Sequence, residues 1–146
     1  MTVLRPMRWW DIDAALVIEQ ELFPDAWSVE TFWAELARVP ETRHYLVADD
    51  DGVVVGYAGL MTVGRQADVQ TVAVAPDQQG HHVGGSLLRA IVDEATSRGC
   101  TELLLEVRVD NEPALHLYEK AGFERISVRR GYYPGGVDGL VMRLRI

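Results

Sequence analysis

The chain has 146 residues, of which 48% are hydrophobic and 25% charged, and its formal net charge at pH 7 is −8. This length predicts one globular domain, residues 1–146, that buries roughly two thirds of the surface its unfolded chain exposes. No apolar run approaches the roughly 18 residues of a membrane span, and the acidic balance argues against nucleic-acid binding while favouring a basic partner.

The chain start and the cysteine content indicate a compartment. The segment MTVLRPMRWWDID lacks the basic-then-apolar layout of a secretory signal. The single cysteine, Cys100, cannot form an internal disulfide, which suits a reducing environment. We therefore expect a cytoplasmic protein, and we expect it to be a monomer.

Two helices are predicted in the first 45 residues. Asp11 is expected to cap the first helix, because apolar residues follow it at helical spacing. The segment FPDAWS (23–28) ends that helix, and Ser28 can cap a second one. The indoles expected to pack in the core or against helices are Trp9, Trp10 and Trp33.

Strands and helices alternate in the rest of the chain. The expected strands are residues 44–48, 53–60, 68–74, 102–107, 126–130 and 139–146, the first two forming a β-hairpin around an acidic turn. One helix begins at about Gly84 and stops at Gly99, and a short one is capped by Asn111 and ends before Gly122. The order ααβββαβαββ predicts a mixed α/β fold with a central β-sheet flanked by helices.

The predicted strand ELLLEV (102–107) is nearly all apolar, which is typical of a strand buried on both faces. Its carboxylate, Glu106, would then lose solvent, and desolvation would raise its pKa towards a value useful for a general base. The alternative is a carboxylate at a strand end that pairs with Arg108 or another cation.

The segment DQQGHHVGGSLL joins a strand to a helix through a glycine-rich turn. Such a turn offers unpaired backbone N–H groups, here of residues 79–86, and the positive end of a helix dipole. It predicts a phosphate or pyrophosphate site, although neither GxxxxGK[ST] nor GxGxxG is present. The alternative is an ordinary strand–helix connection rich in glycine.

Two segments together carry a family resemblance. TVAVAPDQQGHHVGGSLL, followed by LLLEVRVDNEPALHLYEKAGF, resembles the GNAT superfamily of acetyl-coenzyme A-dependent N-acetyltransferases. DIDAALVIEQELFPDAWSVETF and RRGYYP are similar to its RimI branch, whose members acetylate the N-terminal alanine of a small-subunit ribosomal protein. The resemblance covers essentially the whole chain. It implies a GNAT-type sheet, acetyl-coenzyme A as co-substrate and the N-terminal peptide of a ribosomal protein as partner.

The resemblance implies a cofactor site with one departure from the family pattern. In the family, the pattern [QR]xxGx[GA] holds the pyrophosphate, and His82 stands here at its middle glycine position. We expect His82 to preserve binding, because His tolerates a positive φ better than most residues; the alternative is weakened binding. No metal is expected at His81 and His82. The implied cofactor residues are Val72, Ala73, Val74, Gln79, Gly80, His81, His82, Val83, Gly84, Gly85, Ser86, Asn111 and Tyr118.

The same resemblance assigns the chemistry and the acceptor side. It implies Glu106 as general base, Tyr118 as general acid towards the coenzyme A sulphur, and the backbone N–H near Val74 as the group that polarises the thioester. Asp68 and Gln70 share a sheet face and could receive an ammonium group, or they could simply face solvent. The expected substrate-binding residues are Phe23, Trp27, Asp68, Gln70, Glu106, Tyr132 and Tyr133, the aromatic ones on loops.

Three functions remain open from the sequence. An α-amine, with a pKa near 8, loses its proton about 3 kcal/mol more easily than a lysine near 10.4, so a modest base favours a protein N-terminus. The leading hypothesis is therefore an N-terminal acetyltransferase for an alanine-led ribosomal peptide. The alternatives are an acetyltransferase for a small amine or with broader N-terminal and lysine specificity, and a non-catalytic coenzyme A-binding module.

Overall fold

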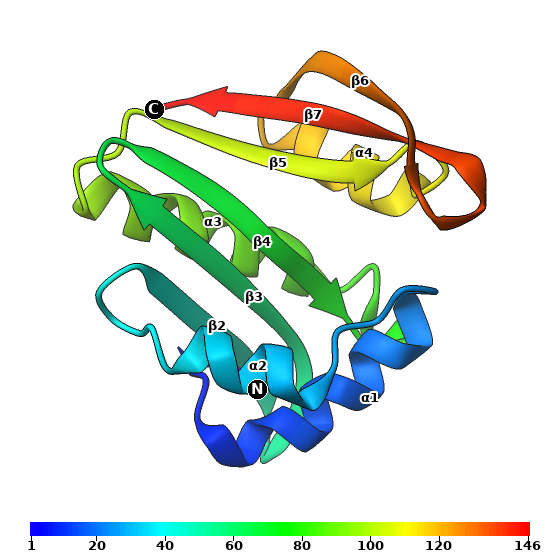
Figure 1. The fold of residues 1–146 in the computed structure, drawn as a ribbon. Helices are drawn as coiled ribbons and strands as arrows, with labels where there is room; N and C mark the ends of the chain where they lie inside the picture. The colour runs from blue at the N-terminus through cyan, green and yellow to red at the C-terminus, as the bar shows by residue number, and fades with distance from the viewer.

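The computed structural model describes residues 1–146 as a seven-stranded sheet with helices on both faces (Figure 1). The strands are β1 (Thr2–Pro6), β2 (Arg43–Asp50), β3 (Val53–Val63), β4 (Gln66–Val74), β5 (Glu102–Arg108), β6 (Glu124–Tyr133) and β7 (Val137–Arg145). The helices are α1 (Ile12–Leu22), α2 (Val29–Leu36), α3 (Val83–Ser97) and α4 (Glu112–Lys120), with short 3-10 turns η1 (Trp9–Asp11), η2 (Pro76–Gln78) and η3 (Pro134–Gly136). No helix is long and apolar enough to cross a membrane.

The sheet order is β1-β2-β3-β4-β5-β7-β6, and every pair is antiparallel except β4 with β5. The predicted mixed α/β fold is confirmed, with one strand more than the sequence indicated. That strand is β1, which has no alternating pattern and is mostly exposed or half-buried. It forms by pairing antiparallel with β2, and Pro6 closes it at the sheet edge, where a proline is tolerated.

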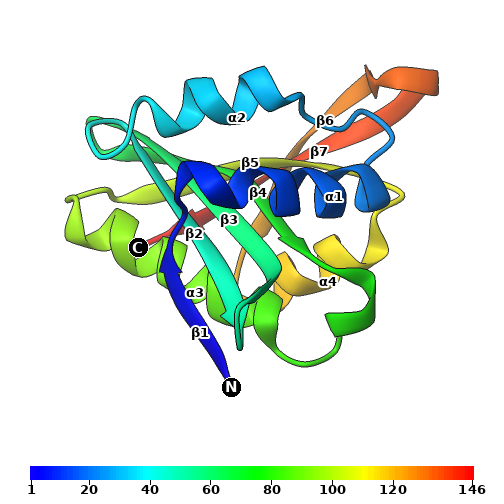
Figure 2. The same ribbon diagram turned by 90° about the horizontal axis from the view of Figure 1, so that it is seen from below.

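The helices form one layer on each side of the sheet. Figure 2 shows α1 and α2 on one face and α3 and α4 on the other. As predicted, the apolar stripe of α3 is buried, with Leu87, Leu88, Ile91 and Ala95 at most 1% exposed. Ser28 and Asn111 act as helix caps, because their side-chain oxygens accept hydrogen bonds from the Thr31 and Ala114 N–H groups.

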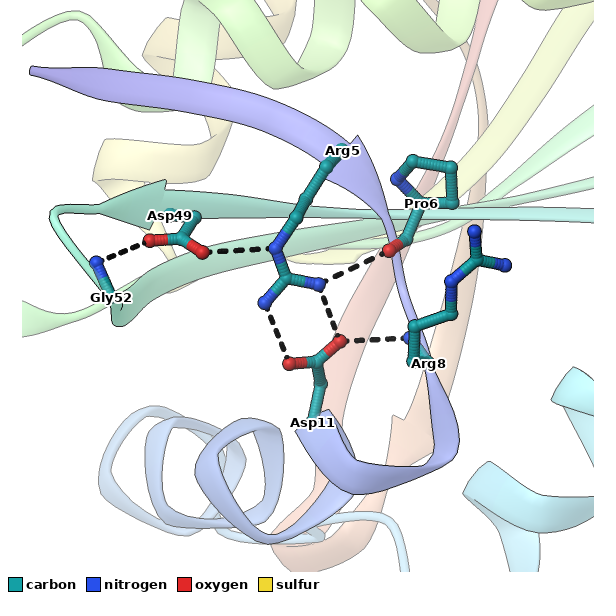
Figure 3. Close-up of polar contacts among 6 residues, drawn as sticks. All are labelled: Arg5, Pro6, Arg8, Asp11, Asp49 and Gly52. Carbon is teal, nitrogen blue, oxygen red and sulfur yellow. Dashed lines mark hydrogen bonds and ion pairs between the residues drawn. The ribbon is translucent and has the colours of Figure 1, made fainter.

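Asp11 has a different role from the expected side-chain cap of α1. Its carboxylate binds residues that precede it in the chain. It accepts two 2.8 Å hydrogen bonds from the Arg5 guanidinium and one from the Arg8 N–H (Figure 3). Arg5 also donates to Asp49 at 2.9 Å. The network therefore ties β1, the start of α1 and the end of β2 together.

The three tryptophans expected to be packed lie at the surface instead. Trp9 and Trp10 are each 60% exposed and Trp33 is 49% exposed. Trp9 stacks on Trp33 and meets Trp10 edge-on, so the indoles pack against one another rather than inside the core. Trp27 alone among the four packs inwards, against Phe32.

The parallel neighbours β4 and β5 pair only at their beginnings. The paired positions run from Gln66 with Glu102 to Asp68 with Leu104. Beyond them β4 continues to Val74 and β5 to Arg108, and the two strands diverge (Figure 1). The later half of β4 therefore has a neighbour on one edge only, which leaves its backbone groups on the other edge free to bind a ligand.

Candidate active site

The end of β4 presents a backbone donor at this unpaired edge. The Ala75 N–H donates to the Val55 carbonyl of β3 at 2.8 Å. Successive residues of a strand direct their backbone groups to opposite edges, so the Val74 N–H points away from β3. The Val74 carbonyl, on that same edge, accepts a hydrogen bond from the Gln79 side chain at 3.3 Å. Gln79, the first residue of the [QR]xxGx[GA] pattern, is thus hydrogen-bonded to the end of β4.

The loop after β4 contains two residues with positive φ before the start of α3. His82 has φ +64° and ψ +10°, so the residue at the pattern's middle glycine position does adopt the left-handed conformation, as Gly80 does with φ +85°. The Ser86 N–H is the first in α3 to bond within the helix, to the His82 carbonyl. The N–H groups of Val83, Gly84 and Gly85 consequently lack helical partners and lie at the positive end of the helix dipole.

The two imidazoles of the loop lie over a surface hollow of about 530 Å³. It runs between the start of α3 and the edge strand, and its lining includes Thr2 and Leu4 of β1 and Asp50 of β2. Both histidines are exposed. No group of three or more His, Cys, Asp or Glu side chains is placed to hold a metal ion.

Glu106 is more accessible than its apolar strand suggested. β5 alternates, with Leu103, Leu105 and Val107 buried, whereas the Glu106 side chain is 33% exposed. The expectation of a strand buried on both faces is therefore wrong, because the face that carries Glu106 is open to solvent. Instead, Glu106 forms a 2.9 Å ion pair with Arg129 of β6. The alternative of a carboxylate paired with a cation is the one the structure contains.

Arg108, the other cation considered for Glu106, has a different partner. Its guanidinium binds Asp110 through two nitrogens at 3.0 and 3.1 Å. It also lies 5.5 Å from the centre of the Tyr133 ring. Arg108 therefore borders the aromatic side of the site and leaves the Glu106 carboxylate to Arg129.

Asp68 lies near enough to Glu106 for the two carboxyl groups to interact. Burial and the negative charge of Glu106 both raise the pKa of Asp68. Gln70 occupies a bulge, because Thr71 pairs with Gly59 while Val69 pairs with Leu60. The bulge shifts the alternation of β4 by one residue between Val69 and Val72, which both face the same apolar cluster. Asp68 and Gln70 are both half-buried, and Val69 between them faces the apolar cluster.

Tyr118 is almost completely buried on α4. Its side chain is 6% exposed and meets Phe123 edge-on, with 5.7 Å between the ring centres. Burial raises its pKa, and Tyr133 adds to that effect. The phenol therefore keeps its proton throughout the physiological pH range. Asn111, seven residues earlier, accepts a hydrogen bond from the Ala114 N–H with its side-chain oxygen, and its amide N–H₂ is left to donate to a ligand.

The aromatic residues expected at the acceptor side lie on two segments. Phe23 and Trp27 are half-buried on the α1–α2 connection, as predicted. Tyr132 and Tyr133 were expected on a loop, but they form the last two residues of β6. Tyr132 is 50% exposed and carries the Arg129 guanidinium over its ring, 4.9 Å from the centre. Burial and the charge of Glu106 raise the pKa of Tyr133 to about 12.

Two residues near the site were not assigned roles from the sequence. Arg129 was covered only by the general possibility of another cation, and no local pattern distinguishes it from Arg130. Glu19 is 3% exposed, inside an apolar cluster. Its signal was present, because it occupies the apolar stripe of the predicted first helix along with Ala15 and Leu22.

Comparison with known proteins defines the class. The chain belongs to the acetyltransferase (GNAT) family, whose model matches residues 12–123. It is accordingly an acetyltransferase with acetyl-coenzyme A as its acetyl donor.

Within this family, the chain is similar over most of its length to N-terminal acetyltransferases of two bacteria. The chain is 40% identical over 140 residues to the N-alpha-acetyltransferase RimI of Mycobacterium tuberculosis, covering 91% of this chain and 85% of that protein. It is 34% identical to the [ribosomal protein bS18]-alanine N-acetyltransferase of Escherichia coli, over all of this chain and 99% of that one. The crystal structure of the ribosomal-protein-S18-alanine N-acetyltransferase from Escherichia coli superposes with a TM-score of 0.89, covering 100% of this chain and 94% of that chain.

Proposed function

We propose that residues 1–146 act as one catalytic domain that transfers the acetyl group of acetyl-coenzyme A to the α-amine of an alanine-led N-terminus of a small-subunit ribosomal protein. The observation that carries this proposal is the full-length similarity to enzymes named for that reaction, at 34% identity with 99% of the Escherichia coli protein covered. The net charge of −8 would favour encounter with a basic partner.

Glu106 is the proposed general base. An alanine α-amine with a pKa near 8 needs little help to lose its proton at neutral pH, so a carboxylate is a sufficient acceptor. The neighbouring carboxyl group of Asp68 adds negative potential that attracts the incoming ammonium group. The substrate cation would take the position of the Arg129 guanidinium beside Glu106, an exchange made easy because Arg129 is 50% exposed.

The Val74 N–H is the proposed donor to the thioester oxygen. As the amine nitrogen attacks the carbonyl carbon, negative charge develops on that oxygen, and a fixed backbone donor stabilises it. The C–S bond then breaks, and the electron pair leaves on the coenzyme A sulphur. The free N–H groups of the first turn of α3, with the loop through His82, would hold the pyrophosphate.

Tyr118 is the proposed acid for the departing thiolate. Its raised pKa keeps the phenol protonated, so a proton is always available. The same burial that weakens the phenol as an acid makes a thiolate beside it more basic, which keeps the proton transfer feasible. Phe23, Trp27, Tyr132 and Tyr133 would form the walls that grip the first residues of the peptide backbone.

The test is release of coenzyme A with a panel of hexapeptides that differ only at residue 1. Two further acceptors are run beside the panel: a lysine peptide with a blocked N-terminus, and a polyamine. The proposal expects the alanine-led peptide to give the highest kcat/KM. Preference for the blocked lysine peptide or the polyamine would replace it by one of the alternatives above.

A further inference from the structure

Glu19 is a carboxylate inside the apolar layer between α1 and the sheet. It is 3% exposed, and the neighbouring side chains Ile18, Phe32 and Tyr57 are each at most 4% exposed. The Glu19 carboxylate has two hydrogen-bond partners, and both are neutral donors. It forms no ion pair. Burial raises its pKa, and the two donors only partly offset that effect. A charge held in this way is unfavourable for folding unless it has another use.

The two hydrogen bonds of Glu19 connect the sheet to the α1–α2 connection. One carboxylate oxygen accepts from the Tyr57 hydroxyl, on β3. The other accepts from the Trp27 backbone N–H at 3.0 Å. Tyr57 is fully buried and pairs in register with Ala73, next to the Val74 donor at the end of β4. Glu19 thus links Trp27 to β3, the strand that pairs with the one carrying the proposed thioester contact.

The connection that Glu19 holds lies against the acceptor side. The negative charge of Asp25, two residues before Trp27, contributes to the raised pKa of both Tyr133 and Arg108. Figure 2 shows the α1–α2 connection on the side of the sheet where β6 and β7 meet. The Trp27 ring packs on Phe32 with 5.3 Å between ring centres. The Trp27 side chain is therefore fixed by the core, and its backbone by Glu19.

A second glutamate in this layer, Glu35, differs from Glu19 in having a cation as partner. Glu35 of α2 also accepts from a tyrosine hydroxyl in the same layer, that of Tyr45 at 2.7 Å, but its ion-pair partner is Arg43 at 2.8 Å. Glu35 has the cation that a buried carboxylate ordinarily needs, and it makes no bond to residues 23–28. Glu19 lacks the cation and has the backbone N–H of the connection in its place.

We propose that Glu19 is a positioning residue for peptide binding: it holds Trp27 and the α1–α2 connection in the conformation that receives the acceptor peptide. The inference rests on the proposed function for its kinetic consequence, but not for its structural one. An apolar side chain of similar length would satisfy the packing and leave the Trp27 N–H without an acceptor. The connection would then sample other conformations, and the peptide, not acetyl-coenzyme A, would bind less well.

The test compares Glu19→Met with Glu19→Gln, and uses Glu35→Gln as matched control. Hydrogen exchange of the Trp27 backbone amide is followed by NMR, and the KM values for the alanine-led hexapeptide and for acetyl-coenzyme A are measured separately. In Glu19→Met, loss of a bond to a charged acceptor should speed Trp27 exchange and raise the peptide KM by about tenfold each. The acetyl-coenzyme A KM should not change. Glu19→Gln retains an acceptor and should restore both values, and Glu35→Gln should alter neither.

Retained protection of the Trp27 amide in Glu19→Met would overturn the inference. So would a parallel rise of both KM values, which would mark Glu19 as a residue of the fold alone. If Glu19→Met does not fold, Glu19→Asp withdraws the acceptor by one methylene and must show the same selective change to a smaller degree. If the parent protein does not acetylate the peptide, the proposed function fails, and the exchange measurement still decides whether Glu19 holds the connection.

Discussion

Two arginine–carboxylate pairs lie in different regions of this molecule and have different surroundings. At the edge of the sheet, Arg5 binds Asp11 through two 2.8 Å hydrogen bonds, and Asp11 is 4% exposed. At the acceptor side, Arg129 binds Glu106 at 2.9 Å, with the two side chains 50% and 33% exposed. The distances are nearly equal, so the difference lies in burial and in additional partners.

The additional partners make the first pair structural and the second exchangeable. Asp11 also accepts the Arg8 N–H, and Arg5 also binds Asp49, so separating them would leave several groups unsatisfied. Although burial alone would raise the pKa of Asp11, Arg5 and the Arg8 N–H outweigh it and lower that pKa. The exposed pair is worth at most about 1 kcal/mol, so an incoming cation can replace Arg129 at little cost.

The largest expected effect is on the buried pair. Asp11→Ala should lower the free energy of unfolding by about 3 kcal/mol, the low end for breaking such a pair, because Arg5 is partly exposed and retains Asp49. Urea unfolding followed by tryptophan fluorescence measures this change, with Asp49→Ala as the milder control. If the free energy of unfolding fell by less than about 1 kcal/mol, the Arg5–Asp11 pair would contribute no more to stability than an exposed pair.

Removing the carboxylate of the exposed pair, Glu106, should lower the reaction rate rather than the stability. Glu106→Gln should lower kcat by about 100-fold or more, the usual scale for a general base, while acetyl-coenzyme A affinity stays the same. The readout is steady-state kinetics together with calorimetric titration of the cofactor. Turnover at the parent rate would remove Glu106 from the role of base.

Tyr118→Phe separates the acid from the base. Loss of the phenol proton should slow thiolate departure by an amount similar to the Glu106 change, up to about 100-fold, while the buried ring keeps its packing on Phe123. Rates are compared over a range of pH. If the variant matches the parent at every pH, the hydroxyl has no catalytic role and Tyr118 belongs only to the core.

Substitution of His82, which belongs to neither ion pair, measures the cost of its backbone conformation. His82 adopts φ +64°, which costs a non-glycine residue roughly 1 kcal/mol, so His82→Gly should bind acetyl-coenzyme A at least as tightly and unfold no more easily. His82→Val, with its branched side chain, should be destabilised. Thermal unfolding and calorimetry test both variants. Markedly weaker binding by the glycine variant would show that the imidazole itself contacts the cofactor.

The smallest expected effect is at the exposed arginine. Arg129→Gln should change the free energy of unfolding by less than about 1 kcal/mol and should leave the rate of the chemical step within a few fold. Removal of the competing cation should favour the peptide ammonium group, so the peptide KM should fall or stay constant. A KM that rises strongly would show that Arg129 contacts the peptide rather than standing in its place.

The central elements were predictable because each carries a local signal. The apolar stripe of α3, the Ser28 and Asn111 caps and the acidic hairpin turn all lie within a few residues of sequence. β1 carries no such signal, because its pairing partner β2 is about 40 residues away. The positive φ of His82 was likewise predicted, from the position it occupies in the loop pattern.

The site was predicted less completely because its environment is made by distant strands. ELLLEV indicated burial on both faces, but on one face of the sheet α1 packs on β3 and β4 and α2 packs on β2, and Glu106 of β5 stays exposed. Arg129 reaches Glu106 only because β7 lies between β5 and β6, an order that the sequence does not state. The bulge at Gln70 also depends on the pairing of β3 with β4.

One measurement tests the central claim most directly: mass spectrometry of a single alanine-led peptide that also contains an internal lysine, after incubation with the protein and acetyl-coenzyme A. Both amines are then present at equal concentration in one molecule, and the α-amine is favoured by about 3 kcal/mol in deprotonation alone. We expect one acetyl group, on the alanine nitrogen. Acetylation of the lysine with a free N-terminus, or a peptide left unmodified, would contradict it.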